Sequence, residues 1–422
     1  MDASPGDPRL RRISPALSRR DLLVGAALGG AATGLAACGF GPAPSAASAE
    51  PSPTASPLPT IGPSIAPPSD TGPSATPGPT LREMIAALIV VGFRGSTLDD
   101  AAWLSTALRE TGLGGVILFD RDQETGGQRN VVSPDQVAAL VGDLRAAAGG
   151  REIVVSVDQE GGRVTRLSPA HGFPAVASEA EIGAGSIDAA RTWARAIAAT
   201  LTSVGINLNL APVVDLDVNP TSPAIGALDR SFSADPDVVV AMATAEIEAH
   251  RAAGVRTTLK HFPGIGSATA NTDFGVADVT TTWTRTELEP FRRLIAAGTA
   301  DLVMAGHVVN RQLDPDLPAS LSRAVVTDLL RGELGWDGIV ITDDLQAAAI
   351  DEAFGQDEAI LLALEAGNDV LLLANQQAYD PAIVERVVAV VAEAVNSSRL
   401  PETRIREVWT RTQRLFGPRT GG

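Results

Sequence analysis

The chain has 422 residues, of which 45% are hydrophobic and 20% charged, with a formal net charge of −17. This composition is ordinary for a globular protein with a sizeable core, and the length fits two average domains or one large α/β domain. The negative charge argues against nucleic acid as a partner, because phosphates require a basic face, and against binding to an anionic bilayer surface.

Residues 1–37 are interpreted as an export signal. The segment opens with a basic front, formed by Arg11, Arg12, Arg19 and Arg20. An uncharged run rich in Ala and Gly follows from Leu22 to Ala37, and it is shorter than the about 20 apolar residues that cross a bilayer. A cleaved signal peptide therefore fits better than a permanent anchor. Residues 18–23, SRRDLL, resemble a twin-arginine signal, and a chance arginine pair in a general secretory signal is the alternative.

Cys38 is the only cysteine, so the chain cannot form an intrachain disulfide. The sequence LAAC at residues 35–38 resembles a bacterial lipobox, in which cleavage leaves Cys38 as a lipid-modified N-terminus. An incidental buried thiol is the alternative. Residues 38–80 are dominated by Pro, Ser, Ala and Thr, which favour a disordered tether. We expect an exported cell-membrane lipoprotein that faces the extracytoplasmic side and contacts the membrane only through the lipid at Cys38.

From residue 81 onward, short apolar runs alternate with Ala- and Leu-rich segments of helical spacing such as residues 186–203 and 236–253. The runs are residues 87–93, 115–119, 153–158, 206–212, 256–262, 302–307, 338–344 and 369–374. Near-continuous apolar strands separated by helices predict a parallel sheet covered on both faces. Eight such units over residues 81–417 favour a single (β/α)8 TIM-type barrel. A doubly wound open sheet is the alternative, but residues 92–100, GFRGSTLDD, lack its Gly-rich phosphate-binding turn.

Polar side chains stand where several of these runs end. They are Asp158 after the third run, Asp215 beyond the fourth, Lys260 and His261 in the fifth, His307 in the sixth, and Asp343 and Asp344 in the seventh. In a barrel the carboxyl ends of the strands meet at one mouth, where barrel enzymes place their chemistry. We therefore expect these side chains to converge on one site.

Two carboxylates that face each other across a cleft are the groups needed to break a glycosidic bond. Asp343, in GIVITDDL, is the candidate nucleophile, since a helix expected from about Ala347 would favour its ionised form. The alternative is that Asp343 or Asp344 serves only as the N-cap of that helix.

Five ordered motifs resemble glycoside hydrolase family 3, and most closely its single-domain β-N-acetylhexosaminidase branch, the NagZ type. They are DQEGGRVTRL at residues 158–167, NLAPVVDL at 209–216, DRSF at 229–232, KHFPGIG at 260–266 and ITDDL at 341–345. The resemblance covers residues 81–417. It implies a (β/α)8 barrel and a retaining mechanism through a covalent glycosyl–aspartate.

The resemblance also implies roles for individual residues. Asp343 matches the nucleophile, and Asp158 matches the carboxylate that binds sugar hydroxyls in the innermost subsite. Further substrate-binding positions are matched by Arg166, Arg230, Lys260, His261 and, less specifically, His307. Charged groups of these kinds grip vicinal hydroxyls through charge-assisted hydrogen bonds. The alternatives are that Arg166 and Arg230 form surface ion pairs and that His307 is a core residue.

The loop after Lys260 departs from the family pattern, which reads K-H-F-P-G-H-G and later D-[S/T]-H, the last histidine being the acid/base and the aspartate orienting it. Here Ile265 replaces the first of these histidines, Asn271 stands at the orienting position and Asp273 at the acid/base position. Asp273 can take over the acid/base role if burial or the charge of Asp343 raises its pKa.

The resemblance implies a retaining β-N-acetylhexosaminidase that removes terminal N-acetylglucosamine, and the expected export points to peptidoglycan fragments as the substrate. We expect no cofactor or metal, and a monomer. Three alternatives stay open. The enzyme could act only on good leaving groups, or the chain could be a surface-tethered sugar-binding protein that has lost turnover. A Schiff-base lysine at Lys260 is the third, and it requires a neutral amine. A metal site at His261, His307 and Asp343 is disfavoured, because the chain lacks HxH and HExxH spacing.

Overall fold

Residues 78–416 are the part of the chain that this computed structural model describes, with side chains described as far as residue 413. They lie within one compact unit. Three predicted features lie outside the described residues: the export signal, the lipid attachment site at Cys38 and residues 39–77 of the tether. Within residues 78–416, none of the helices has the length and apolar character that crossing a bilayer requires.

Eight parallel strands form the central sheet, in the order β10-β1-β2-β3-β6-β7-β8-β9. They are β1 (Ile89–Gly92), β2 (Gly115–Leu118), β3 (Val154–Val157), β6 (Leu208–Asn209), β7 (Arg256–Phe262), β8 (Leu302–Ala305), β9 (Ile339–Thr342) and β10 (Leu371–Leu373). A parallel bridge between Ile341 and Val370 joins β9 to β10 and closes the sheet. All eight predicted runs are strands of this sheet, and the predicted (β/α)8 barrel is confirmed.

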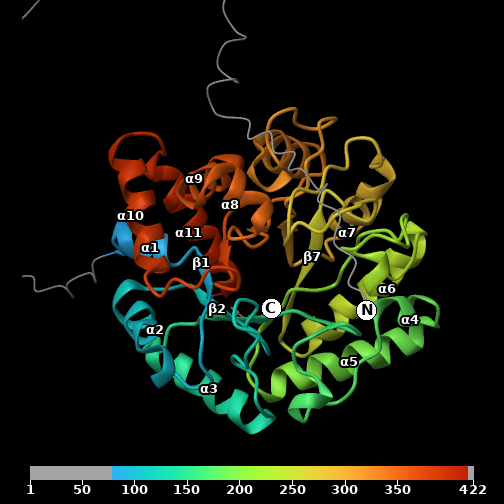
Figure 1. Ribbon diagram of the computed structural model, residues 1–422, viewed down its shortest axis with the longest axis horizontal. Coiled ribbons are helices and arrows are strands. Elements are labelled where there is room, and N and C mark those ends of the chain that lie inside the picture. The colour runs from blue at the N-terminus through green and yellow to red at the C-terminus, as the bar shows by residue number, and fades with distance from the viewer. Residues whose placement is uncertain (1–77, 417–422) are drawn as a thin grey trace, which may run out of the picture. The chain divides into compact units, whose positions relative to one another are not determined.

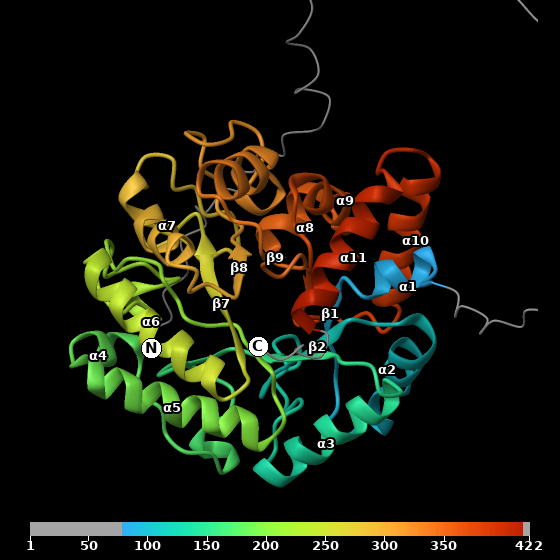
Figure 2. The same ribbon diagram turned by 180° about the vertical axis from the view of Figure 1, so that it is seen from behind.

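Helices surround the strands on the outside, as Figures 1 and 2 show from opposite sides. They are α1 (Leu81–Ala86), α2 (Ala102–Thr106), α3 (Pro134–Ala147), α4 (Glu179–Gly183), α5 (Ile187–Ser203), α6 (Pro236–Ala252), α7 (Glu289–Ala296), α8 (Ala348–Phe354), α9 (Gln356–Ala366), α10 (Ile383–Asn396) and α11 (Glu402–Phe416). Two π-helical segments, Ala107–Thr111 and Ala324–Glu333, complete the layer. The predicted helices at 186–203 and 236–253 are confirmed as α5 and α6.

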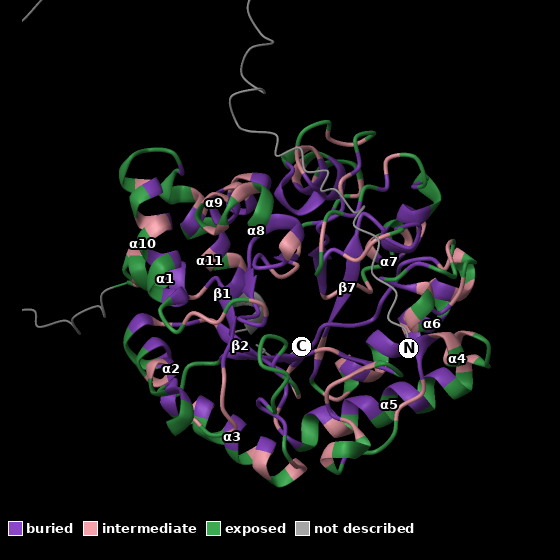
Figure 3. Ribbon diagram, viewed as in Figure 1, coloured by how far each residue is buried: buried purple, intermediate pink, exposed green. Residues whose placement is uncertain are grey.

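The two apolar layers explain why the strands read as continuous hydrophobic runs. On β8, Leu302 and Met304 belong to a cluster inside the barrel, whereas Val303 packs in the layer between strands and helices. The sheet is therefore buried on both faces, as Figure 3 shows by its buried strands and by helices exposed on their outer sides.

Local capping explains where the longer helices begin. The Ser186 side chain accepts a hydrogen bond from the backbone N–H of Ala189 at the start of α5. Asp235 caps α6, whose first residue is Pro236, a residue that lacks the N–H a first turn would leave unpaired. A small antiparallel hairpin, β4 (Gln159–Gly161) with β5 (Val164–Thr165), follows β3 and carries part of the site.

Candidate active site

A pocket of about 580 Å³ opens at the carboxyl ends of the barrel strands. Its lining includes predicted site residues from six different segments: Asp158, Arg166, Arg230, Lys260, His261, Asn271, Asp273 and Asp343. The structure thus brings together residues that lie as far apart in the sequence as 158 and 343. We call the part formed by Asp158, Glu160, Arg230 and Lys260 the buried end of the pocket. The part formed by residues 119–123, 271–274 and 374–377 is called the rim.

The buried end is a cluster of two cations and two carboxylates. Lys260 Nζ lies 2.7 Å from Asp158 Oδ1 and 2.6 Å from Glu160 Oε1. Arg230 binds Glu160 with two groups, Nε at 2.7 Å and Nη2 at 2.8 Å, a bidentate pair that fixes the guanidinium plane. Arg230 is therefore part of a buried cluster, and the surface-ion-pair alternative for it is wrong.

The charges in this cluster hold one another ionised. Burial acts to raise the pKa of Glu160, but Arg230 and Lys260 outweigh it and hold that pKa below its ordinary value. Burial acts to lower the pKa of Lys260, and Asp158 and Glu160 raise it instead. Lys260 is therefore a cation, which removes the neutral amine that a Schiff-base mechanism requires.

Asp215 fixes the imidazole of His261. Its Oδ2 lies 2.7 Å from His261 Nδ1 and also accepts the backbone N–H of His261 at 3.1 Å, while its Oδ1 accepts the N–H of Ile265 at 2.8 Å. Because a carboxylate only accepts, Nδ1 carries a proton and Nε2 is the nitrogen that faces Arg230, 3.4 Å from its Nη2. Asp215 thus joins the strand end of β6 to that of β7.

Asp343 follows β9 and lines the pocket. Its backbone N–H donates to Ala305 O at 3.0 Å, and its Oδ1 accepts the N–H of Asp344 at 2.9 Å. Burial acts to raise its pKa, but the imidazoles of His307 and His261 and the Asp344 N–H outweigh it, so the pKa of Asp343 is lowered. The lowered pKa favours the ionised form of this carboxyl.

The N-cap interpretation of Asp343 and Asp344 is wrong. Helix α8 begins at Ala348, its N-cap is Ala347, and no side-chain capping bond is among the contacts of this described segment. Asp344 Oδ1 instead accepts the N–H of Ala374 at 2.9 Å and that of Gln346 at 3.1 Å. Burial raises the pKa of Asp344 to about 7. Asp344 therefore ties the end of β9 to the segment that follows β10.

His307 lies buried behind the pocket wall. Its Nε2–H donates to Asp344 O at 2.8 Å, and its Nδ1 lies 2.7 Å from the hydroxyl oxygen of Ser320. Burial lowers the pKa of His307, against the opposing charge of Asp343. This placement agrees with the core-position alternative, and it makes His307 a support for the strand ends of β8 and β9.

Asp273 stands at the rim, in an exposed position that faces the pocket. Its backbone carbonyl accepts the Gln377 side-chain amide at 2.6 Å. Although the residue as a whole is exposed, the protein atoms that crowd its carboxyl and the negative charge of Asp343 raise the pKa of Asp273. Asn271 uses its side-chain oxygen to accept the backbone N–H of Asp273 at 3.0 Å, so it shapes the turn. Ile265 is buried in the apolar core below the loop.

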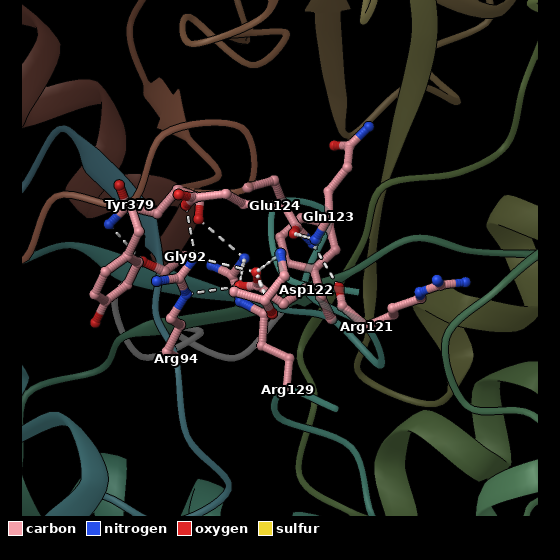
Figure 4. A network of polar contacts seen from close by, with 12 residues as sticks. Gly92, Arg94, Arg121, Asp122, Gln123, Glu124, Arg129 and Tyr379 are labelled. Carbon is pink, nitrogen blue, oxygen red and sulfur yellow. Dashed lines mark hydrogen bonds and ion pairs between the residues drawn. The ribbon is translucent and has the colours of Figure 1, made fainter. Parts of the chain in front are cut away.

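The rim is held together by a network around Arg129, shown in Figure 4. The buried Arg129 donates to the carbonyls of Phe93, Ala374 and Asn375 at 2.7, 2.8 and 3.0 Å. Gly92 lies so close that a Cβ there would stand 1.9 Å from Ala374 O, which explains the glycine. The network fixes the loops after β1, β2 and β10 against one another.

Gln376 joins two of these loops directly, because its Oε1 accepts the Gln123 N–H at 2.9 Å and its Nε2 donates to Arg121 O at 3.1 Å. Arg166 is held more loosely, with its guanidinium 3.6 Å from Asp158, 3.9 Å from Asp120 and 5.3 Å from the centre of the Phe119 ring. These rim contacts give the pocket a preformed mouth.

Sequence reasoning did not single out Glu160, Asp120 or the Gln376–Gln377 pair as site residues, and it noted Asp215 only as a strand-end residue. Glu160 lies inside the DQEGGR motif, so its position two residues after Asp158 was an available signal. Among the described residues, no group of three or more His, Cys, Asp or Glu side chains is arranged to hold a metal ion.

The chain is similar in sequence to known proteins. Residues 80–415 match the family described as glycosyl hydrolase family 3 N terminal domain. A protein named beta-hexosaminidase from Tolumonas auensis is 38% identical over 284 residues, which cover 66% of this chain and 80% of that relative. A protein of the same name from Xanthomonas euvesicatoria pv. vesicatoria is 35% identical over 325 residues, which cover 74% and 90%.

Solved structures with the same fold carry related names. A glycoside hydrolase family 3 beta-N-acetylglucosaminidase from Paenibacillus superposes with a TM-score of 0.73 at 35% identity, covering 80% of this chain and 62% of that one. This chain therefore spans less than two thirds of the Paenibacillus protein. A beta-N-acetylhexosaminidase from Beutenbergia cavernae superposes with a TM-score of 0.72 at 34% identity, covering 81% and 99%.

Proposed function

This chain belongs to glycosyl hydrolase family 3 and is a glycoside hydrolase, and we propose that it is a retaining β-N-acetylhexosaminidase that releases terminal N-acetylglucosamine. The names of its relatives from Tolumonas, Xanthomonas and Beutenbergia support this specificity. Peptidoglycan fragments are the substrate that we propose for an exported enzyme. In this proposal, Asp343 and Asp273 carry out the chemistry, and the buried end binds the sugar.

The observation that carries the proposal is the placement of two carboxyls, Asp343 and Asp273, in the lining of one pocket. The pKa of Asp343 is lowered, whereas the protein atoms around the Asp273 carboxyl and the charge of Asp343 raise the pKa of Asp273. Carboxyls whose pKa values are driven apart in this way suit a nucleophile and a general acid. Asp273 therefore takes the role that a histidine holds in the resembling family pattern.

The reaction proceeds in two balanced steps. In the first, Asp343 attacks the anomeric carbon, the bond to the leaving oxygen breaks, and the proton of Asp273 passes to that oxygen. In the second, the Asp273 carboxylate removes a proton from water, the water oxygen attacks the anomeric carbon, and the bond to Asp343 breaks. The sugar keeps its configuration, and both carboxyls return to their starting states.

The buried end binds the sugar that is released. Asp158, Lys260 and Arg230 present a fixed arrangement of charges, and His261 adds Nε2 in an orientation set by Asp215. Vicinal hydroxyls can donate to the carboxylate and accept from the cations at once, which makes these hydrogen bonds charge-assisted. Since the partners hold one another in place, little side-chain freedom is lost on binding.

The test is turnover of a nitrophenyl N-acetyl-β-glucosaminide by the purified full-length chain, with Asp343→Ala as the control. We expect turnover by the wild type and a loss of about 10⁴-fold or more in the variant, as for other catalytic nucleophiles. A fluorinated N-acetylglucosaminyl fluoride, which deglycosylates slowly, should label the peptide that contains Asp343. Equal silence of wild type and variant would instead favour the sugar-binding alternative.

The cellular address is a separate part of the proposal. We propose that Cys38 becomes the lipid-bearing N-terminus of an exported, membrane-attached enzyme, and the LAAC sequence before an expected tether supports this. Cells that express the Cys38→Ser variant should release the protein from the membrane fraction and should not incorporate a fatty-acid label into it. Equal labelling of both proteins would contradict the assignment.

A further inference from the structure

Phe274 is a large apolar side chain that stands exposed at the rim of the pocket. Its exposed fraction is 71%, it lines the pocket, and it directly follows Asp273 in the chain. A phenylalanine usually buries most of its surface, so an exposed ring next to reacting groups marks a contact that a ligand completes. Among the described residues, the other exposed large hydrophobic side chains are Val132, Val218 and Val276.

The backbone that leads into Phe274 is held by hydrogen bonds, so the ring is presented from a fixed segment. The N–H of Phe274 donates to Asn271 O at 3.1 Å, and the preceding carbonyl of Asp273 accepts the Gln377 amide at 2.6 Å. The N–H of Ala349, at the start of α8, donates to Thr272 O at 3.3 Å. A ring presented from a fixed loop costs less ordering when a ligand binds.

The place of Phe274 in the reaction follows from its neighbour. In the proposed function, Asp273 delivers a proton to the leaving oxygen, so the residue after Asp273 lies on the leaving-group side of the scissile bond. The released sugar occupies the buried end, which is separate from the rim. The polar groups of Asp120, Arg121 and Gln377 line the same mouth and suit hydroxyls at the edges of a ring.

We propose that Phe274 is the platform of a leaving-group subsite, on which the apolar face of a second pyranose ring packs. The inference rests on the proposed function and deepens it, because it names the residue that favours leaving groups with a sugar ring. A single exposed ring flanked by polar groups fits a sugar, which has one apolar face and polar edges, better than it fits an extended apolar chain.

The experiment compares Phe274→Ala with the wild type on four N-acetyl-β-glucosaminides. Two have leaving groups with a ring, diacetylchitobiose and the nitrophenyl glycoside, and two lack a ring, the methyl glycoside and the glycosyl azide. Each pair contains one poor and one good leaving group. We expect kcat/KM to fall about tenfold, the equivalent of ~1.4 kcal/mol, on both ring substrates and to stay unchanged on the methyl glycoside and the azide.

Val276→Ala is the matched control, because Val276 is 56% exposed on the same loop and stands outside the described residues that line the pocket. It should leave all four substrates unchanged, and Phe274→Trp should restore the ring substrates.

A fall in kcat/KM confined to diacetylchitobiose and the methyl glycoside, the two poor leaving groups, would overturn the inference. It would show that Phe274 positions Asp273. A uniform loss, or no loss, would overturn it too. Wild-type silence on all four substrates would overturn the proposed function itself.

Discussion

Glu160, Lys260 and Arg230 at the buried end of the pocket hold one another through side-chain ion pairs, whereas Asp273 at the rim is held through its backbone. The buried end is thus preformed by its own charges. At the rim, the loop conformation is fixed while the side chains of Asp273 and Phe274 stay free to meet a substrate.

This difference explains how the acid/base position can differ from the family pattern without damage to the sugar-binding end. Asn271 and Gln377 bind the backbone of Asp273. Among the described contacts, the side chain of Asp273 makes no hydrogen bond that supports the loop. If Asp273 is the proton donor that we propose, an exchange there alters that donor and leaves the cluster of Glu160, Lys260 and Arg230 intact. Substitutions at the two ends should therefore have different signatures.

The largest effect is expected at the buried end, from Glu160→Ala. The change leaves Lys260 and Arg230 without their shared carboxylate, and removing one partner of a buried pair costs about 3–5 kcal/mol. We expect a lower free energy of unfolding and a large loss of kcat/KM that is equal for good and poor leaving groups. Denaturant unfolding measures the free energy of unfolding. Kinetics on the glycosyl azide and the methyl glycoside measure kcat/KM for a good and a poor leaving group.

The matched control for Glu160→Ala is Glu333→Ala, which removes an exposed ion pair with Arg285. An exposed pair contributes about 0–1 kcal/mol, so stability and activity should barely change. If Glu160→Ala were as mild as this control, the buried end would not depend on its charge cluster.

At the rim, Asp273→Ala should instead give a loss that depends on the leaving group. General acid catalysis contributes ~10²–10⁴-fold, so kcat/KM should fall by that factor on the methyl glycoside and little on the azide. Added azide ion should speed breakdown of the glycosyl–Asp343 intermediate and yield a β-glycosyl azide, because azide needs no general base. Product analysis by mass spectrometry checks this outcome.

Asp278→Ala is the control for this rim variant, since Asp278 is an exposed carboxylate nearby that pairs with Arg311. It should leave the dependence on the leaving group unchanged. A loss in Asp273→Ala that was the same for every substrate would exclude Asp273 as the acid/base.

The pH profile sharpens the contrast further. With a poor leaving group, kcat/KM should fall at high pH as Asp273, whose pKa is raised, loses its proton. It should fall at low pH as Asp343, whose pKa is lowered, gains one. The double variant Asn271→Asp, Asp273→His should move only the alkaline limb upward, because the ordinary pKa of His is about 6.5 and that of Asp about 3.9. An unmoved alkaline limb would contradict the assignment.

The fold was predictable because its signal is local. A strand buried on both faces favours a continuous apolar run, and six of the eight runs come close to one. The exceptions are residues 206–212, INLNLAP, and 256–262, RTTLKHF, whose polar residues include the site residues Lys260 and His261. The strand ends then predicted the convergence of Asp158, Lys260 and Asp343. Their spacing along the chain carries that information, since every βα unit returns to the same mouth.

The contacts between side chains were not predictable in the same way. Lys260 meets Glu160, and His261 meets Asp215, across strands whose sequences give no sign of which side chains pair. His307 likewise supports the pocket wall through contacts with Ser320 and with the backbone oxygen of Asp344. These groups are distant in sequence, and only the fold brings them to His307. Pairing at such distances follows from strand register and rotamers rather than from spacing.

The smallest effect is expected beneath the buried end, at Glu246 on α6. Its carboxyl is buried, and neither oxygen has a hydrogen-bond partner among the described residues. Burial and the charge of Glu160 raise its pKa well above the ordinary value, against the opposing charge of Lys260. Glu179, whose pKa burial and Glu246 also raise, lies close by. The folded protein therefore holds a proton here that the unfolded chain releases.

Stability should consequently fall as pH rises above the ordinary Glu pKa, by at most about 1.4 kcal/mol per pH unit for one such group. Glu246→Gln cannot ionise, so its advantage over the wild type should grow with pH, which urea unfolding between ~pH 5 and ~pH 9 would measure. Glu248→Gln changes an exposed side chain of the same helix and serves as the control. Parallel stability curves for wild type and Glu246→Gln would mean that Glu246 is ionised in the folded protein, with Lys260 as the cation that holds it so.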